Sequence, residues 1–247
     1  MDNQTRRPMS RMRKLYTARL IGRCIALIAC AVVALTRPEK FDVIKPGRFF
    51  SEFSPLHLLW GIWIFDMLAQ LVPIKNKLSI GSIKLFPQNF RPIREKINTD
   101  ALKKYIITTT QAAYQVMLIW VALIAIIGIL YWKNIIGQLT LFMISVLFYV
   151  CDLICVLIWC PFRLLMKTRC CTTCRIFNWD HLMMFSPMLF INSFFARSLF
   201  IMSLLAWLVW EVTIMLYPER FWEQTNGALK CANCTDKLCT QYCQKLR

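Results

Sequence analysis

The segment Tyr105–Trp132 reads YIITTTQAAYQVMLIWVALIAIIGILYW and contains no charged residue. The hydrocarbon core of a bilayer is about 30 Å thick, and a helix needs about 20 residues to cross it. Only helices and closed barrels satisfy their backbone polar groups in that core, and this segment lacks the alternating pattern of a barrel strand. The sequence therefore predicts that this segment crosses a membrane as an α-helix.

Other apolar runs extend this prediction to the whole chain. The chain is 57% hydrophobic and only 17% charged, whereas soluble domains carry about 25% charged residues. Four predicted spans cover about Leu20–Leu35, Leu56–Val72, Ile106–Tyr131 and Ile135–Trp159. Prolines, which start or stop helices, flank these runs at positions 38, 55, 73 and 161. These features exclude a soluble globular fold and predict an all-α, polytopic helical membrane protein.

A fifth apolar region, Leu182–Tyr217, is divided by Arg197 into the pieces Leu182–Phe195 and Ser198–Tyr217. The region is long for one span and short for two. One long tilted helix, a tight hairpin, and a re-entrant segment followed by one span all fit this length. We therefore expect five or six membrane elements.

Lys and Arg residues are concentrated in segments that fall on one side of the predicted bundle. These segments precede the first span, connect the second span to the third, and follow the fourth. Because cytoplasmic flanks carry the excess of Lys and Arg, we predict an integral protein of the cell membrane with a cytoplasmic N-terminus. The basic residues of the tail favour a cytoplasmic C-terminus as well. The first span is expected to be retained as an anchor, since the basic segment before it is longer than that of a cleaved signal.

The chain accordingly divides into five parts. They are a basic cytoplasmic N-terminal segment (1–19), a four-helix transmembrane region (20–160) with a basic cytoplasmic loop (74–105), a loop with a CxxC motif (161–181), a last membrane hairpin or re-entrant element plus span (182–217), and a Cys-rich tail (218–247). Within the basic loop, residues 75–104 lie between two spans, so the lipid bilayer and its anionic headgroups are the expected partners, and a nucleic acid is not. Partner membrane subunits are also expected. Asn98 is predicted to cap the helix that follows this loop.

Cysteines outside the predicted spans form two groups. The first group contains one CxxC motif and the second contains another, and a pair of such motifs suits a tetrahedral metal ion. We predict a zinc site in a cytoplasmic cap, with Cys171, Cys174, Cys231 and Cys234 as ligands. The remaining candidates are Cys170, Cys239 and Cys243.

The same cysteines are compatible with three other states. The tail cysteines alone have the number of thiols that an iron–sulfur cluster requires, although their spacing differs from that of the ferredoxins. An extracellular tail would instead carry two disulfides. Free thiols are the third alternative.

Ionisable residues within the apolar runs form a second candidate site. A charged side chain at the centre of a bilayer costs about 2.5–3.5 kcal/mol on insertion scales, so it should face the interior of the bundle. With the tail inside, Arg23, Asp66, Asp152 and Glu211 share the cytoplasmic half of the membrane. Pairing of Arg23 with one of the acids is the structural interpretation. An ion or proton path is the functional one.

Several function classes are disfavoured. No stretch reads GxGxxG or GxxxxGK[ST], which argues against a Rossmann or P-loop nucleotide site. The histidines, His57 and His181, are predicted to lie on opposite membrane faces and so cannot hold one haem. No nucleophile–base arrangement indicates an enzyme.

We therefore expect a membrane protein whose structural zinc site holds the last membrane element against the bundle, as a component of a membrane complex or a transport system. Electron transfer through an iron–sulfur cluster on the same cysteines is one alternative. Ion or proton transport by the intramembrane acids is the other.

Overall fold

The computed structural model of the chain describes residues 10–51, 53–72, 82–93, 98–168, 170–234 and 238. Across these residues the fold is helical, without a named strand; an isolated bridge joins Pro92 and Asn226. Four helices are long and apolar enough to cross a membrane: α1 (Arg11–Thr36), α4 (Thr99–Trp132), α5 (Gln138–Leu157) and α8 (Phe194–Leu216). The apolar helix α2 (Leu56–Leu71) is shorter. The prediction of an all-α fold is thereby confirmed, and the four apolar helices fit a membrane protein; five or six membrane elements and a Cys-rich cap stay predictions.

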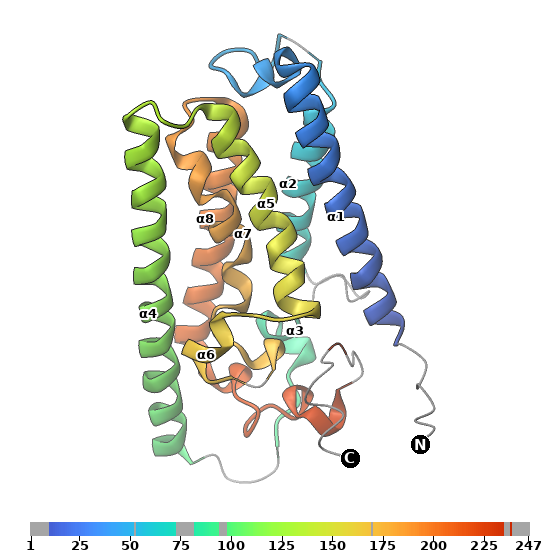
Figure 1. Cartoon of the computed structure of the whole chain (residues 1–247). Helices are drawn as coiled ribbons and strands as arrows, with labels where there is room; N and C mark the ends of the chain where they lie inside the picture. Colours follow the sequence, from blue (N-terminus) through green and yellow to red (C-terminus); the bar gives the residue numbers. More distant parts are fainter. Residues whose placement is uncertain are drawn as a thin grey trace, which may run out of the picture.

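The long helices form an upright bundle in which α1 and α4 run in one direction and α2, α5 and α8 run in the opposite direction (Figure 1). We call the end at which α1 begins and α8 ends the basal end, and the opposite end the distal end. Short elements cover the basal end: α3 (Ser82–Leu85), η2 (Pro87–Asn89), α6 (Phe162–Met166), η3 (Cys171–Thr173), η4 (Phe177–Trp179), η6 (Pro218–Phe221), η7 (Gly227–Leu229) and η8 (Cys231–Asn233). The distal end carries η1 (Pro38–Ile44).

The segment formed by α7 (Asp180–Phe185) and η5 (Ser186–Phe190) runs from the basal end to the distal end. At its start, Asp180 accepts a hydrogen bond from Gln70 on the last turn of α2. At its end, Phe190 packs against Gly128 and Tyr131 near the distal end of α4. Within the bundle this part of the chain therefore passes from end to end and does not return to the face it came from.

An irregular backbone at this depth needs protein around it, because lipid offers no hydrogen bonds. Pro187 lacks an N–H and interrupts the regular helix between α7 and η5. Ser186, Pro187 and Met188 are all buried. The Ser186 hydroxyl donates to the carbonyl of Met183 at 2.8 Å and accepts from the Trp120 indole at 3.0 Å. Neighbouring helices thus satisfy and enclose the broken segment.

Side-chain caps mark where three of the long helices begin. The Asn98 side chain accepts hydrogen bonds from the backbone N–H groups of Asp100 and Ala101, each at 3.1 Å, which confirms the predicted cap of α4. Ser10 caps α1 and Ser193 caps α8 in the same way. The cap at Ser193 explains why α8 starts before Arg197, so that the arginine lies within the helix rather than at a break.

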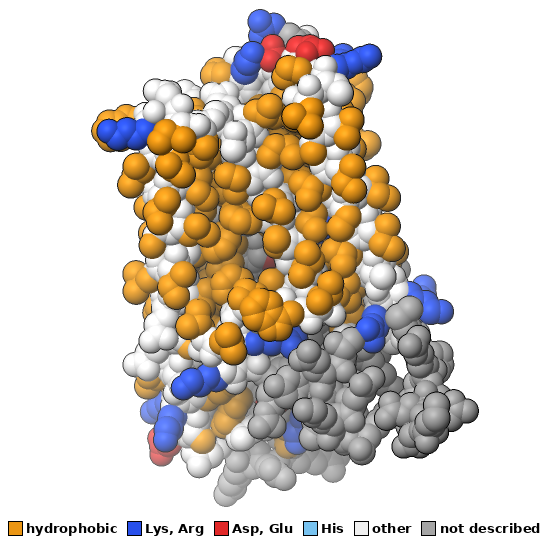
Figure 2. Space-filling view, viewed as in Figure 1, with side chains coloured by type: hydrophobic (Ala, Val, Ile, Leu, Met, Phe, Trp, Pro, Cys, Tyr) orange, Lys and Arg blue, Asp and Glu red, His pale blue; other side chains and the backbone are white. Residues whose placement is uncertain are grey.

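The largest core cluster joins α2, α5, α7 and α8 through aromatic side chains. Trp63, Phe142, Phe185 and Phe195 are fully buried, and the Trp63 ring lies 5.1 Å from Phe185 and 6.1 Å from Phe142, centroid to centroid. The outer surface is also apolar. Figure 2 shows a broad hydrophobic band around the middle of the bundle, with Lys and Arg toward the two ends. This is the surface that a lipid bilayer would contact.

Gly128 offers a test of the packing between α4 and η5. A methyl group at Gly128 would overlap the Phe190 ring, whereas one at Gly61 would meet nothing within 4 Å. We expect Gly128→Ala to lower the free energy of unfolding by about 1–3 kcal/mol through overpacking. Gly61→Ala, the matched control on α2, should leave it unchanged or raise it slightly. Thermal unfolding in detergent, followed by circular dichroism, compares them; equal midpoints for the two variants would contradict the contact.

Candidate functional site

An ion pair between α1 and α5 lies in the basal half of the bundle. The Arg23 Nη1 donates to Asp152 Oδ2 at 2.7 Å and to the backbone carbonyl of Tyr149 at 2.6 Å. The guanidinium carbon also lies 3.8 Å from the centroid of the Tyr149 ring. The two side chains are only 11% and 17% exposed. The predicted pairing of Arg23 with an acid is therefore formed, with Asp152 as the partner.

A second polar pair stands at the start of α7. Asp180 Oδ1 lies 3.1 Å from His181 Nδ1, and its Oδ2 accepts from Gln70 Nε2 at 3.2 Å. The His181 side chain is 4% exposed. Its Nε2 is buried without a hydrogen-bond partner among the described residues. Because Asp180 occupies the Nδ1 side, the free Nε2 is the ring atom at which a proton can be gained or lost.

Both pairs line one cavity, which we call the acid cavity. Its walls are Tyr16, Arg19 and Arg23 of α1; Phe65, Asp66, Ala69 and Gln70 of α2; Asp152, Leu153 and Val156 of α5; and Phe177, Asp180 and His181. It offers about 50 Å³ to the centres of water-sized molecules, which is room for a few waters. Asp66 lines it without an ion pair or hydrogen bond to the described residues.

The charge of the acid cavity depends on His181. Three carboxylates face two guanidinium groups, so the wall carries one net negative charge when His181 is neutral and none when His181 is protonated. Arg23 and Asp152 neutralise each other, and Asp180 is held by Gln70 and His181. Asp66 is left as the acid that a proton or a small cation can approach through water.

Three of the four predicted ionisable residues, Arg23, Asp66 and Asp152, therefore meet at one cavity, and Glu211 does not. Glu211 accepts from Arg175 at 2.6 Å and from the Trp179 indole at 2.8 Å, in a separate cluster at the basal end.

The sequence analysis did not assign Asp180 and His181 to this site. Their signal in the sequence is an Asp-His pair placed directly before an apolar run, which puts ionisable groups at the mouth of a membrane element.

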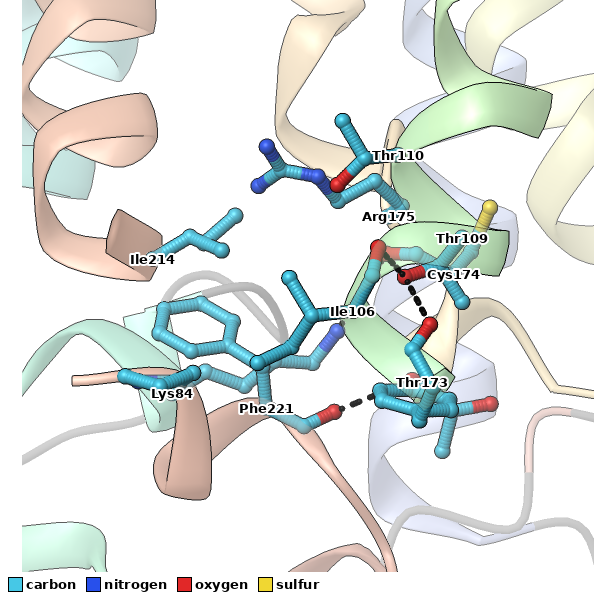
Figure 3. Close-up of a pocket in the computed structure, with 11 residues that line it drawn as sticks. Lys84, Ile106, Thr109, Thr110, Thr173, Cys174, Arg175, Ile214 and Phe221 are labelled. Carbon is cyan, nitrogen blue, oxygen red and sulfur yellow. Dashed lines mark hydrogen bonds between the residues drawn. The ribbon is translucent and has the colours of Figure 1, made fainter. Parts of the chain in front are cut away.

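A second, smaller cavity lies at the basal end between α3, α4 and α8 (Figure 3). Lys84 enters it from α3 and is only 1% exposed. Its Nζ donates to the carbonyl of Cys174 at 3.4 Å and lies 5.6 Å from the centroid of the Trp210 ring. Burial lowers the pKa of Lys84 to about 8. The expectation that the loop 75–104 faces lipid headgroups therefore stays a prediction for its other basic residues, since Lys84 points inward.

The cysteines of the first predicted metal motif lie beside this cavity. Cys174 is buried, and burial raises the pKa of its thiol to about 11. Burial also raises the pKa of Cys171, whose sulfur accepts from Arg163 at 3.2 Å. A metal ion would have to displace the protons of these thiols.

The second motif is only partly described. Cys231 is exposed and Cys234 is half-buried, while Cys239 and Cys243 lie outside the described residues. Across the part of the chain that the structure describes, no group of three or more His, Cys, Asp or Glu side chains converges to hold a metal. The zinc cap and its iron–sulfur alternative, together with the cysteine ligands named for them, stay predictions.

No protein-family model, no curated protein and no solved structure matches this chain. The function is therefore argued from the geometry of the molecule alone.

The Arg23–Asp152 pair is tested by removing one charge. We expect Asp152→Asn to lower the free energy of unfolding by about 3–5 kcal/mol, because it leaves the buried Arg23 charge uncompensated. Asp42→Asn is the matched control. Asp42 pairs with Lys45 at 2.7 Å on the exposed distal end, where an ion pair contributes about 0–1 kcal/mol. Denaturant titration of both variants in detergent measures the difference, and equal losses would show that Arg23 does not depend on Asp152.

The predicted metal site is tested by measuring the metal content of the purified protein. Mass spectrometry of anaerobically purified protein should find about one zinc ion per chain in a colourless sample, if the four cysteines form a tetrahedral site. The double variant Cys171→Ser, Cys174→Ser should lose the metal, while Cys24→Ala on α1 should keep it. Iron with sulfide and visible absorbance would establish the iron–sulfur alternative. A metal-free protein would eliminate both.

Proposed function

We propose that this protein transports protons or a small monovalent cation across a membrane, with the acid cavity as the binding site. Asp66 is the water-facing acid, the Arg23–Asp152 pair sets the local charge, and Asp180 orients His181. The observation that carries the proposal is the convergence of three acids and a histidine with a free, buried Nε2 on one water-sized cavity inside a membrane bundle. Ionisable groups are expensive at this depth and are expected to mark ion or proton paths.

The acid cavity is closed on its distal side by the aromatic core. Trp63 packs edge-on against Tyr149 at 5.6 Å and against Phe185 at 5.1 Å, directly above the ionisable groups. A transported ion would therefore reach the cavity from the basal end and leave only after these rings move. Transport by this protein would then require an alternating change of conformation.

Two features of the aromatic core support such a change. Trp63 Nε1 and the Ser145 hydroxyl are buried in it without hydrogen-bond partners among the described residues. In a second conformation, water or an ion would satisfy these polar atoms. The broken α7–η5 segment carries Phe185 at its interruption, and discontinuous membrane helices are the elements that build ion sites in many transporters.

We extend the proposal to the topology. Six segments would cross the bilayer in alternating directions: α1, α2, α4, α5, α7–η5 and α8. The start of α1 and the end of α8 would then lie at the basal side. The excess of Lys and Arg in the basal connections supports a cytoplasmic basal side in a cell membrane. The acid cavity then opens to the cytoplasm.

Reconstituted vesicles test the proposed function. Vesicles loaded with a pH-sensitive dye are given a potassium gradient and valinomycin, so that a membrane potential drives protons inward. The protein should accelerate the change in internal pH over protein-free vesicles, and radioactive sodium or rubidium uptake in parallel identifies a cation instead. We expect Asp66→Asn and His181→Gln to slow the flux at least about tenfold, which corresponds to about 1.4 kcal/mol of barrier.

Asp42→Asn, a charge removal at the distal end outside the acid cavity, serves as the control and should transport like the unchanged protein. The proposal fails if the protein moves none of the three ions faster than empty vesicles. It also fails if Asp66→Asn and His181→Gln both keep full flux.

A further inference from the structure

We propose that the cavity between Lys84 and Arg175 binds a phosphate group, carried either by a lipid headgroup or by a small soluble phosphate compound. This site is separate from the acid cavity and does not depend on the transport proposal. It lies at the basal end, where α3, α4 and α8 meet the loop that follows η3 (Figure 3).

The first argument is an excess of buried positive charge. Lys84 is almost completely buried, and the Arg175 side chain is 9% exposed. Among the described residues, Glu211 is the one carboxylate bonded to either of them. Buried charges are normally paired, so this arrangement lacks one anion.

The second argument is the unpaired N–H groups of the Arg175 guanidinium. Its Nη2 donates to Glu211 at 2.6 Å, and the second oxygen of Glu211 is occupied by the Trp179 indole at 2.8 Å. The Nε and Nη1 atoms are buried without a partner among the described residues. They lie on opposite sides of the guanidinium, so each offers a separate charged N–H donor to an anion such as a phosphate oxygen.

The third argument is the direction of the donors. Lys84 reaches the cavity from α3, Thr110 from α4, and Arg175 from the loop after η3. Donors from three elements surround a tetrahedral phosphate more completely than a planar carboxylate. The cavity offers about 20 Å³ to the centres of water-sized molecules, which is room for one or two waters, so a phosphate group would enter it only with a shift of the cavity wall.

The fourth argument is position. The first turns of α4 lie beside the short elements that cover the basal end of the bundle. On the distal side of those turns, the exposed side chains of Ile107 and Tyr114 begin the apolar outer surface. The cavity thus lies at the level where a bilayer presents its phosphates, and basic pockets between membrane helices bind anionic headgroups.

Binding is tested on detergent-purified protein washed free of lipid. The probes are inorganic phosphate, dihexanoyl phosphatidic acid, and dihexanoylglycerol as the same lipid without its phosphate. Titration is followed by the fluorescence of tryptophan, since Trp210 faces Lys84, and by the midpoint of thermal unfolding. The unchanged protein should show a saturable signal and a raised midpoint with phosphatidic acid. Binding of inorganic phosphate as well would identify the phosphate group alone as the ligand, and its absence would identify the lipid headgroup.

Lys84→Met, which keeps the length of the side chain without its charge, should weaken binding at least tenfold. Without ligand its midpoint should equal or exceed that of the unchanged protein, because an uncompensated buried charge is removed. Lys133→Met, at the exposed distal end of α4, should bind normally.

Thr110→Val keeps the shape of the cavity wall, removes one donor, and should also weaken binding. It keeps the test valid if Lys84→Met does not fold. The proposal is overturned if no phosphate probe binds, if dihexanoylglycerol binds as well as phosphatidic acid, or if the cavity variants bind like the unchanged protein.

Discussion

The ion pair between Arg23 and Asp152 holds α1 in the bundle. In lipid, apolar surfaces gain little by meeting one another, so packing and polar contacts decide how helices associate. Tyr16 and Cys30 are the buried residues of α1, and most of its apolar side chains face outward. A charge inside the membrane can be accommodated only beside its partner, so the pair determines the depth and the rotation of α1 relative to α5. The acid cavity exists because α1 is held at that depth.

The α7–η5 segment brings the second half of the acid cavity into place. Its backbone is irregular and carries Asp180 and His181 at its basal start. Such a backbone is stable here because α4, α5 and α8 enclose it and because Trp120 hydrogen-bonds Ser186. A regular helix would fill this space with a continuous apolar stripe. The interruption at Pro187 instead places an irregular segment, enclosed by its neighbours, next to the ionisable groups of the acid cavity.

The short elements at the basal end, which we call the basal cover, bring together polar groups from distant parts of the chain. Lys84, Arg175 and Glu211 come from three segments, and Trp179 and Trp210 lie against them. Glu211 of α8 pairs with Arg175, and this ion pair holds α8 against the loop after η3. The cover and the acid cavity are adjacent along the chain, since Trp179 bonds Glu211 while the next residue, Asp180, faces the cavity.

The sequence by itself determined the helical class of the protein, three of its four long helices together with the shorter α2, and the cap at Asn98, because each depends on local composition and hydrogen bonding. It also indicated that Arg23, Asp66 and Asp152 must face inward, since lipid does not solvate charge. Only the tertiary structure decided which of them meet. Glu211 lies at a similar depth in its helix but faces the basal cover, and Asp180 and His181 join the site because an irregular segment delivers them there.

The path of Leu182–Phe195 was likewise decided by tertiary packing. Its length is compatible with crossing, returning or tilting, and the choice depends on whether neighbouring helices can enclose a broken backbone. That enclosure is a property of several helices together, whereas hydropathy is a property of one segment.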